Sequence, residues 1–464
     1  MDRFDHGKLK ALALSLPDEI EKYENAGLFE EARAAILRRL DGDLIPEMRD
    51  RLELELYILK LLPVQFPYTA EQVVEQMRKE IPSFTMDHLE QMDRQGFAEW
   101  IWADGEKRYI HNTARNLMNL GKNVPWPQKE DPEEEEEKKV LKETCDLIRR
   151  EGRAAWKLRV RASLCVKEEA FKKGDQVTVH LPVPSEAAPV SEVQILSHSG
   201  NAAVDRPDSV FRSICFRETM QENHPFFVEY EYKVTCVHHD FSDEDRSRSV
   251  SCFRPDPAAG EYLKEEYPHI RFTPYLKELA EELKGDETDP VKTARRIYDY
   301  ITENVKYSFM RIYTIMKDIP DYCARNLRGD CGVQALTFIT LCRICGIPAK
   351  WQSGLYVHPN YVGAHDWAMF YAEPYGWVPV DPSFGGSAFR DGDETRRDFY
   401  FGSQDPFRMA ANQAFMQEFF IPKKFWPIDT SDNQTGEAET QDRGFARGEI
   451  ETGQELISWE KLQL

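Results

Sequence analysis

Residues 331–345 constrain the fold most, because they form a segment without a polar face. The apolar residues of this segment are Val333, Ala335, Leu336, Phe338, Ile339, Leu341 and Ile344. They cover nearly the whole circumference of a helix, and such a helix lies buried at the centre of a domain. Gly346-Ile347-Pro348 follows directly, which is typical of a helix that ends sharply. The sequence therefore predicts a domain built around this helix.

A cysteine opens the predicted helix. Cys331 lies in the first turn, where unpaired N–H groups and the positive end of the helix dipole favour a thiolate. A cysteine so placed and paired with a histidine can have a pKa several units below its ordinary value of about 8.5. The alternative is a buried, unreactive thiol. Cys342 and Cys345 fit that alternative, because one C-x-x-C pair without a second pair does not make a zinc site.

Three strands are expected after the helix, and the second carries polar residues on both of its faces. The predicted strands cover residues 350–357, 364–372 and 376–381. Successive side chains of a strand point to opposite faces of its sheet. His365 and Trp367 therefore share one face, while Asp366 lies on the other and is not expected to pair with the histidine.

The third strand brings a second carboxylate near His365. A turn that pairs Tyr371 with Trp377 places Asp381 diagonal to the histidine, within reach of a side-chain hydrogen bond. Cys331, His365 and Asp381 then follow the order of a thiol nucleophile, its base and the carboxylate that orients the base. We therefore predict that these three residues are catalytic.

At these motifs the chain resembles the transglutaminase-like superfamily of papain-like thiol enzymes, in particular its bacterial members. The matching motifs are Gly-Asp-Cys-Gly at 329–332, Gly-Ile-Pro-Ala at 346–349, His-Asp-Trp at 365–367 and Gly-Trp-Val-Pro-Val-Asp-Pro at 376–382. They stand in family order, and the resemblance covers about residues 290–385. One departure is that the family's segment is closer to His-Ala-Trp-Val-Glu-Val. In this chain a carboxylate instead follows the histidine directly.

The resemblance implies an α+β fold and a role for each site residue. Its core is a buried helix against an antiparallel sheet, here preceded by a β-sandwich-like domain and a helical N-terminal domain. Cys331 is implied as nucleophile, His365 as general base and Asp381 as the residue that orients it. The family stabilises the oxyanion with a side chain upstream of the cysteine, and Tyr307 resembles that position. The backbone N–H of Cys331 is a second donor, and Trp367 is assigned to the same pocket.

The length of 464 residues is too great for one ordinary core, so several domains are expected. The predicted parts are a mostly helical domain (1–130), an acidic linker and helix (131–155), a β-sandwich-like domain (156–255), the catalytic core (256–428) and a polar tail (429–464). The tail is expected to pack lightly or to stay loose.

The N-terminal domain contains the pattern of a winged helix. Residues 69–72 have the spacing of a capping box, and Asp104-Gly105 between two β-prone runs indicates a hairpin. A DNA-recognition helix carries clustered Lys and Arg, whereas residues 86–95 contain three acidic residues and one Arg. We therefore expect a structural or protein-contact domain.

The composition argues against several classes of binding partner. The net charge of −21 works against binding of nucleic acid or anionic lipid. No apolar run is long enough for a membrane span, and the N-terminus lacks the pattern of a signal peptide. The nine scattered cysteines then predict reduced thiols and a cytoplasmic location. We expect neither a cofactor nor a bound metal; the oligomeric state stays open.

Several functions are compatible with these patterns. The first is a thiol enzyme that forms an acyl-enzyme on a peptide or protein amide, with hydrolysis (peptidase or amidase) favoured over cross-linking. A second hypothesis is a deglycosylase similar to peptide N-glycanase, but the paired C-x-x-C zinc site implied by that resemblance is missing. The alternative from another class is a non-catalytic protein-binding module on the same fold.

Overall fold

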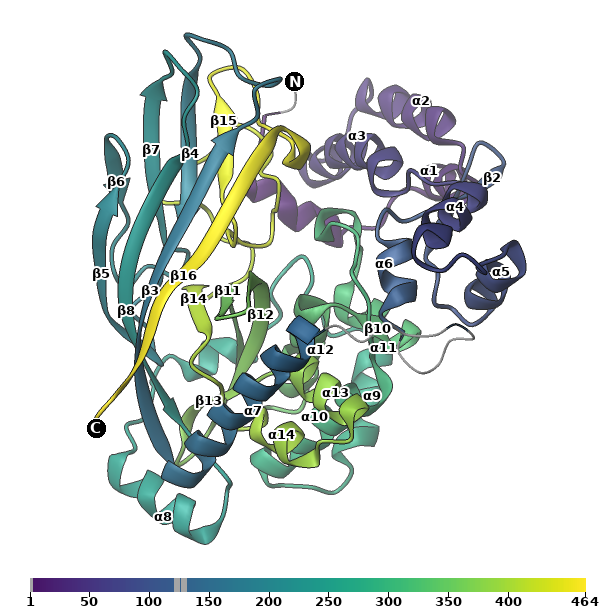
Figure 1. Cartoon of the computed structure of the whole chain (residues 1–464). Coiled ribbons are helices and arrows are strands. Elements are labelled where there is room, and N and C mark those ends of the chain that lie inside the picture. Colours follow the sequence, from purple (N-terminus) through teal and green to yellow (C-terminus); the bar gives the residue numbers. More distant parts are fainter. Residues whose placement is uncertain (1–2, 121–125, 127–131) are drawn as a thin grey trace.

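The computed structural model describes residues 3–120, 126 and 132–464. Figure 1 shows the N-terminal helices beside a core of helices around a small sheet, with a tall pair of β-sheets on the other side. The predicted α+β class is confirmed. The predicted boundary near residue 130 lies largely outside the described residues.

The N-terminal region is helical apart from one hairpin. Its helices are η1 (His6–Ala13), α1 (Asp18–Asn25), α2 (Phe29–Leu40), α3 (Pro46–Gln65), α4 (Ala70–Glu80), α5 (Met86–Arg94) and α6 (Thr113–Met118). Strands β1 (Trp100–Ala103) and β2 (Glu106–Tyr109) form the predicted hairpin. Asp104 and Gly105 both have positive φ in its turn, and Thr69 caps α4 with Gln72 as predicted.

Two four-stranded sheets form the sandwich, in the orders β15-β4-β7-β6 and β16-β3-β8-β5. Their strands are β3 (Arg153–Val166), β4 (Gln176–Pro182), β5 (Val190–His198), β6 (Ala202–Val204), β7 (Ser213–Thr219), β8 (Phe226–Val237), β15 (Glu437–Thr440) and β16 (Ile450–Leu462). The helix α7 (Pro132–Glu151) precedes β3, and Gly152 with positive φ separates them. Inward-facing residues of both sheets share one hydrophobic core.

The C-terminal segment differs from the loose tail expected for residues 429–464. Strand β16 pairs antiparallel with β3 from Ile450 opposite Val166 to Leu462 opposite Ala155, and β15 pairs with β4. Figure 1 shows β16 running along β3 over most of its length. An edge strand needs few buried side chains, because its main-chain hydrogen bonds hold it to its neighbour. The polar composition of β16 therefore hid it from a pattern based on apolar alternation.

The core consists of helices packed on one face of the sheet β13-β12-β11-β14. The strands are β11 (Ala349–His358), β12 (Tyr361–Ala372), β13 (Gly376–Val380) and β14 (Arg408–Asn412), with the short strands β9 (Lys306–Tyr307) and β10 (Arg328–Gly329) paired separately. The helices between the sandwich strand β8 and β14 are α8 (Asp243–Cys252), η3 (Ala259–Leu263), α9 (Pro274–Lys284), α10 (Pro290–Asn304), η4 (Tyr313–Ile315), α11 (Ile319–Asn326), α12 (Cys331–Ile344), α13 (Pro382–Asp391) and α14 (Glu394–Phe399). The short helix η5 (Arg447–Glu449) lies in the C-terminal segment, directly before β16.

Helix α12 lies at the centre of this core, as its sequence predicts. All its residues from Cys331 to Arg343 are buried. On the sheet, Ala368 and Phe370 belong to the same apolar cluster as this helix. Trp367 belongs instead to the cluster of the sandwich, so the two faces of β12 contact different cores.

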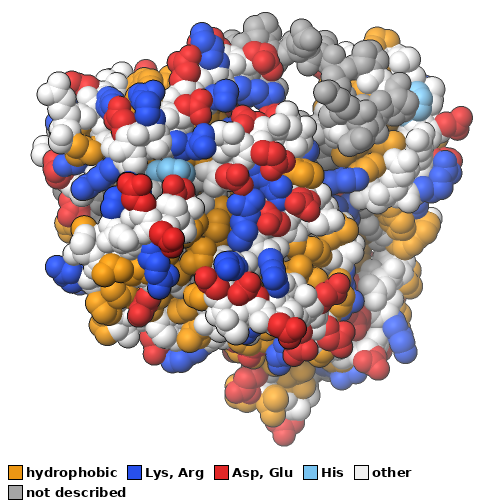
Figure 2. Space-filling view, turned by 90° about the horizontal axis from the view of Figure 1, so that it is seen from below, with side chains coloured by type: hydrophobic (Ala, Val, Ile, Leu, Met, Phe, Trp, Pro, Cys, Tyr) orange, Lys and Arg blue, Asp and Glu red, His pale blue; other side chains and the backbone are white. Residues whose placement is uncertain are grey.

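Two further features concern the charges on the surface and the length of the apolar helices. On the face shown in Figure 2, basic and acidic side chains are interspersed. Among the helices that the structure describes, none is long and apolar enough to cross a bilayer.

Removal of residues 450–464 tests the role assigned to β16. The truncation exposes the edge of β3 and removes its paired neighbour, so we expect the thermal midpoint to fall by on the order of 10 °C and aggregation to increase. Circular dichroism melting measures this change. Removal of Gln463 and Leu464 alone is the control, since both follow the last residue of β16. A truncated protein with an unchanged midpoint would contradict the assignment.

Candidate active site

Cys331 is the first residue of α12, and tight packing holds it there. Asp330 caps the helix by accepting a hydrogen bond from the N–H of Val333 at 3.0 Å. The next residue, Gly332, has no room for a side chain. A Cβ added there would lie 2.3 Å from the hydroxyl of Tyr313 and 2.7 Å from Oδ2 of Asp366. The glycine thus lets the start of the helix approach β12 closely.

The thiol of Cys331 contacts a carboxyl group rather than an imidazole. Its Sγ donates a hydrogen bond to Oδ2 of Asp366 at 3.3 Å, and the phenol of Tyr307 lies beside the sulfur. Burial and the charges of Asp366 and Asp330 raise the pKa of the Cys331 thiol well above its ordinary value. The structure therefore contains a protonated thiol where the sequence predicted a lowered pKa.

The predicted pair of His365 and Asp381 forms. Nε2 of His365 lies 2.7 Å from Oδ2 of Asp381, and the pairing of Tyr371 with Trp377 that predicted this contact is confirmed. Arg408 also approaches Oδ2 of Asp381, at 2.8 Å. Burial raises the pKa of Asp381, but the charges of His365 and Arg408 outweigh it and hold the value at about 2.

This pair lies on the face of β12 opposite Cys331. Side chains alternate along the strand, and on the sandwich face the ring of His365 stacks on Trp367 and lies tilted against Phe384. Trp367 is on that face too, where its Nε1 donates to Gln352 at 2.8 Å. Among the hydrogen bonds of the described residues, none joins Cys331 to His365. The structure thus brings His365 and Asp381 together and places Asp366 beside the thiol.

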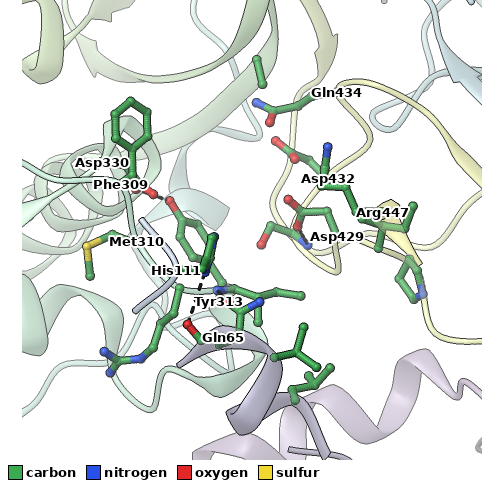
Figure 3. A pocket seen from close by; sticks show the side chains of 18 of the residues that line it. Gln65, His111, Phe309, Met310, Tyr313, Asp330, Asp429, Asp432, Gln434 and Arg447 are labelled. Carbon is green, nitrogen blue, oxygen red and sulfur yellow. Dashed lines mark hydrogen bonds between the residues drawn. The ribbon is translucent and has the colours of Figure 1, made fainter. Parts of the chain in front are cut away.

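A cavity of about 660 Å³ opens beside Cys331. Three distant parts of the chain line it. The described lining includes Gln65 and His111 from the N-terminal region, Tyr307, Tyr313, Asp330, Cys331 and Asp366 from the core, and Asp429, Asp432, Gln434 and Arg447 from the C-terminal segment. Figure 3 shows Asp429, Asp432 and Gln434 facing Tyr313 and Asp330 across this space. Tyr307, chosen from the sequence, is therefore at the thiol, while Trp367 is not part of the described lining.

Several carboxyl groups of the cavity have raised pKa values. Burial raises the pKa of Asp366 to about 8, with the charge of Asp330 adding to the shift. Burial also raises the pKa of Asp330 to about 6. The pKa of Asp432 rises well above its ordinary value through burial and the charges of Asp366 and Asp429. A carboxyl that titrates near pH 8 beside a thiol in a cavity is a typical sign of a functional group.

Sequence reasoning missed Asp366 and Asp432 as site residues. The sequence did contain an indication for Asp366, because this chain has a carboxylate directly after the histidine where the family segment has alanine. Asp432 had no such signal, because it reaches the cavity only through the fold of the C-terminal segment. Within the described ranges, no group of three or more His, Cys, Asp or Glu side chains is arranged to hold a metal ion.

Comparison with known proteins identifies the core. Residues 277–382 match the family model of the transglutaminase-like superfamily. The chain carries a transglutaminase-like domain. Cys331, His365 and Asp381 all lie within the matched residues, as do Asp366 and Tyr307.

Other similarities are more distant. An uncharacterized protein of Haemophilus influenzae is 29% identical over 144 residues, which are 26% of this chain and 39% of that protein. A candidate cysteine protease from Cytophaga hutchinsonii matches in structure with 15% identity and a TM-score of 0.39, over 67% of this chain and 92% of that one. The periplasmic domain of TgpA from Pseudomonas aeruginosa matches with 14% identity and a TM-score of 0.28, over 54% and 94%.

The raised pKa of Asp366 predicts a pH-dependent cost to the stability of the transglutaminase-like domain. The unfolded side chain ionises near pH 4, whereas the folded one holds its proton to about pH 8. Between these values the unfolded state binds fewer protons, so the stability contributed at this site falls as pH rises from about 4 to 8. An asparagine at this position cannot ionise. We therefore expect Asp366→Asn to raise the thermal midpoint at pH 8 relative to its effect at pH 4.

Thermal melts of both proteins at the two pH values measure this difference. Asp208→Asn is the matched control, because the side chain of Asp208 is 74% exposed. An Asp366→Asn effect that is the same at pH 4 and pH 8 would show that the carboxyl is not held neutral by burial.

Proposed function

We propose that this protein is a thiol acyl-transfer enzyme in which Cys331 attacks an amide of a peptide or protein. The observation that supports it is the position of Cys331 at the start of a buried helix and at the wall of a cavity, inside the transglutaminase-like domain. The cavity volume of about 660 Å³ is in the range of pockets that hold small ligands or a few residues of a peptide.

The contact with Asp366 supplies a route for the proton. As Sγ of Cys331 bonds to the amide carbon, its proton passes to the ionised carboxylate of Asp366, 3.3 Å away. The C–N bond then breaks, and Asp366 returns the proton to the departing amine, leaving a thioester. The phenol of Tyr307 and the backbone N–H of Cys331 are the donors for the oxyanion.

Hydrolysis of the thioester completes the proposed cycle. Water adds to the thioester carbon and gives its proton to Asp366, and the C–S bond breaks to release a carboxylic acid. The thiol then regains its proton from Asp366. Because this carboxyl has a pKa of about 8, it can both accept and donate a proton near neutral pH.

A Cys-His-Asp triad is the other form of this proposal. The family order of the motifs supports it, and the bond between His365 and Asp381 would orient the imidazole as a triad requires. In this structure the imidazole lies on the other face of β12, so the triad would need His365 to reach the cavity face. The two forms differ in which residue acts as the base.

A non-catalytic protein-binding module is the second candidate function. Two observations favour it: the raised pKa of the Cys331 thiol and the separation of that thiol from the imidazole of His365. In such a module the cavity would bind a peptide without chemistry, and the role of Cys331 would be structural.

Labelling with a thiol-reactive acyl probe separates enzyme from binder. We expect wild-type protein to be labelled at Cys331 and Cys331→Ala to lose that label completely. Peptide mapping by mass spectrometry locates the modified residue. Cys252 is exposed and therefore accessible to the probe, so Cys252→Ala is the control that removes labelling at this exposed thiol and leaves Cys331 in place. Absence of label at Cys331 in the wild type would favour the binding module.

The pH profile of labelling identifies the base. If Asp366 is the base, the rate rises through about pH 8 as its carboxyl ionises, and Asp366→Asn lowers the rate by roughly 10²- to 10⁴-fold. His365→Gln then lowers it by less than about tenfold, since the imidazole acts only through the packing of β12. Stopped-flow labelling between pH 5 and 10 provides both measurements. The opposite ranking of the two variants would assign the base to His365.

A further inference from the structure

The segment 308–312, which runs from strand β9 to helix η4 along the cavity wall, has no regular secondary structure of its own. Backbone N–H and C=O groups that are shielded from water need hydrogen-bond partners. At Phe309 one side chain of the N-terminal region supplies both. Nδ2 of Asn116 donates to the carbonyl of Phe309 at 3.0 Å, and its Oδ1 accepts from the N–H of Phe309 at 2.7 Å. Asn116 lies on α6, is 5% exposed and pairs with the segment as a neighbouring strand would.

Helix α6 also contacts the ring of Phe309. The guanidinium of Arg115 lies over this ring, 3.5 Å from its centroid. The same ring meets the ring of Tyr307 edge to face, with centroids 5.3 Å apart. The phenol of Tyr307 in turn lies beside the sulfur of Cys331. A continuous set of contacts therefore runs from α6 through two aromatic rings to the thiol.

The side chain of Tyr307 adjoins two open spaces. It lines the cavity at Cys331 and also a second cavity of about 210 Å³, whose wall includes Phe97 and Asn116. Dense packing fixes a side chain in a protein interior, and a ring that borders two cavities lacks part of that packing. The orientation of Tyr307 therefore depends on how firmly its own segment is anchored.

We propose that Asn116 and Arg115 are positioning residues, which hold the phenol of Tyr307 where it can donate to the oxyanion. This role rests on the proposed function, in which Tyr307 is one of the oxyanion donors. Both positioning residues lie outside residues 277–382, the part that matches the transglutaminase-like family. A misplacement of about 1 Å at a reacting group can lower a rate by roughly 100-fold, so an anchor outside the site can control the reaction.

Hydrogen exchange measures the anchor itself. In Asn116→Ala the N–H of Phe309 loses its acceptor, so we expect the peptide that contains residues 307–313 to exchange at least tenfold faster than in the wild type. Mass spectrometry after transfer to deuterated buffer gives this rate. Asn119→Ala is the matched control, because Asn119 directly follows the same helix and is exposed.

Two labelling reactions at Cys331 measure the effect on the chemistry. An acyl probe reacts through an oxyanion, whereas iodoacetamide alkylates the same sulfur by displacement of iodide and forms none. We expect Asn116→Ala to slow acylation by roughly 10- to 100-fold and to change alkylation by less than about threefold. In a Tyr307→Phe background the same substitution slows acylation by less than about threefold, because it acts through the phenol that this variant lacks.

The outcomes distinguish this role from the proposed function. Unchanged exchange in Asn116→Ala overturns the anchor. With a labelled wild type, equal slowing of acylation and alkylation, unchanged acylation, or a full additional loss in the Tyr307→Phe background overturns the positioning role alone. A wild type that is alkylated at Cys331 but takes no acyl label refutes the enzyme, and the positioning role fails with it.

Discussion

The alternation of side chains along β12 is the constraint on which this structure depends. The strand lies between two hydrophobic cores, one built around α12 and one shared with the sandwich. Adjacent residues therefore serve different environments: Asp366 faces the thiol of Cys331, and His365 faces Trp367 and Phe384. A shift of the strand by one residue would exchange these partners and place polar groups in an apolar core. The register with β11 and β13 thus decides which group meets the nucleophile.

A network of buried charges holds the sandwich face of β12 in place. The side chain of Arg408 on β14 is fully buried and lies 2.8 Å from Asp381 and 3.2 Å from Asp405. Asp381 caps α13 and bonds to His365, so the network joins β12, β14 and the start of α13. Buried ion pairs of this kind add little net stability, but loss of one member is costly because it leaves an unpaired buried charge. We interpret the network as a device that orients β12 relative to its neighbours.

The cavity exists because distant segments meet at the start of α12. The N-terminal region contributes α3 and α6 to the cavity wall. The C-terminal segment passes the start of α12 on its way from the core back to the sandwich. Contacts such as the stacking of Tyr57 on Trp426, with ring centroids 4.0 Å apart, connect the two. The segments far from the transglutaminase-like domain therefore determine the polarity of its site. A domain reduced to the matched residues 277–382 would lack Asp429, Asp432 and Ser431.

The sequence by itself determined the features that depend on local periodicity and register. The apolar circumference of residues 331–345 predicted a buried helix, and the turn chemistry of Asp104-Gly105 predicted a hairpin. The pairing of Tyr371 with Trp377 followed from one turn and led to the bond between His365 and Asp381.

Only the tertiary structure decided which face of β12 meets α12. Alternation predicts that neighbouring residues face opposite ways, but packing selects the side that the helix covers, and here it brings Asp366 to Cys331. The same holds for β16 and for Asp432. Both lie in polar sequence. Main-chain pairing with β3 positions β16, and the approach of the C-terminal segment to the cavity positions Asp432. Neither of these long-range contacts leaves a periodic pattern in the sequence.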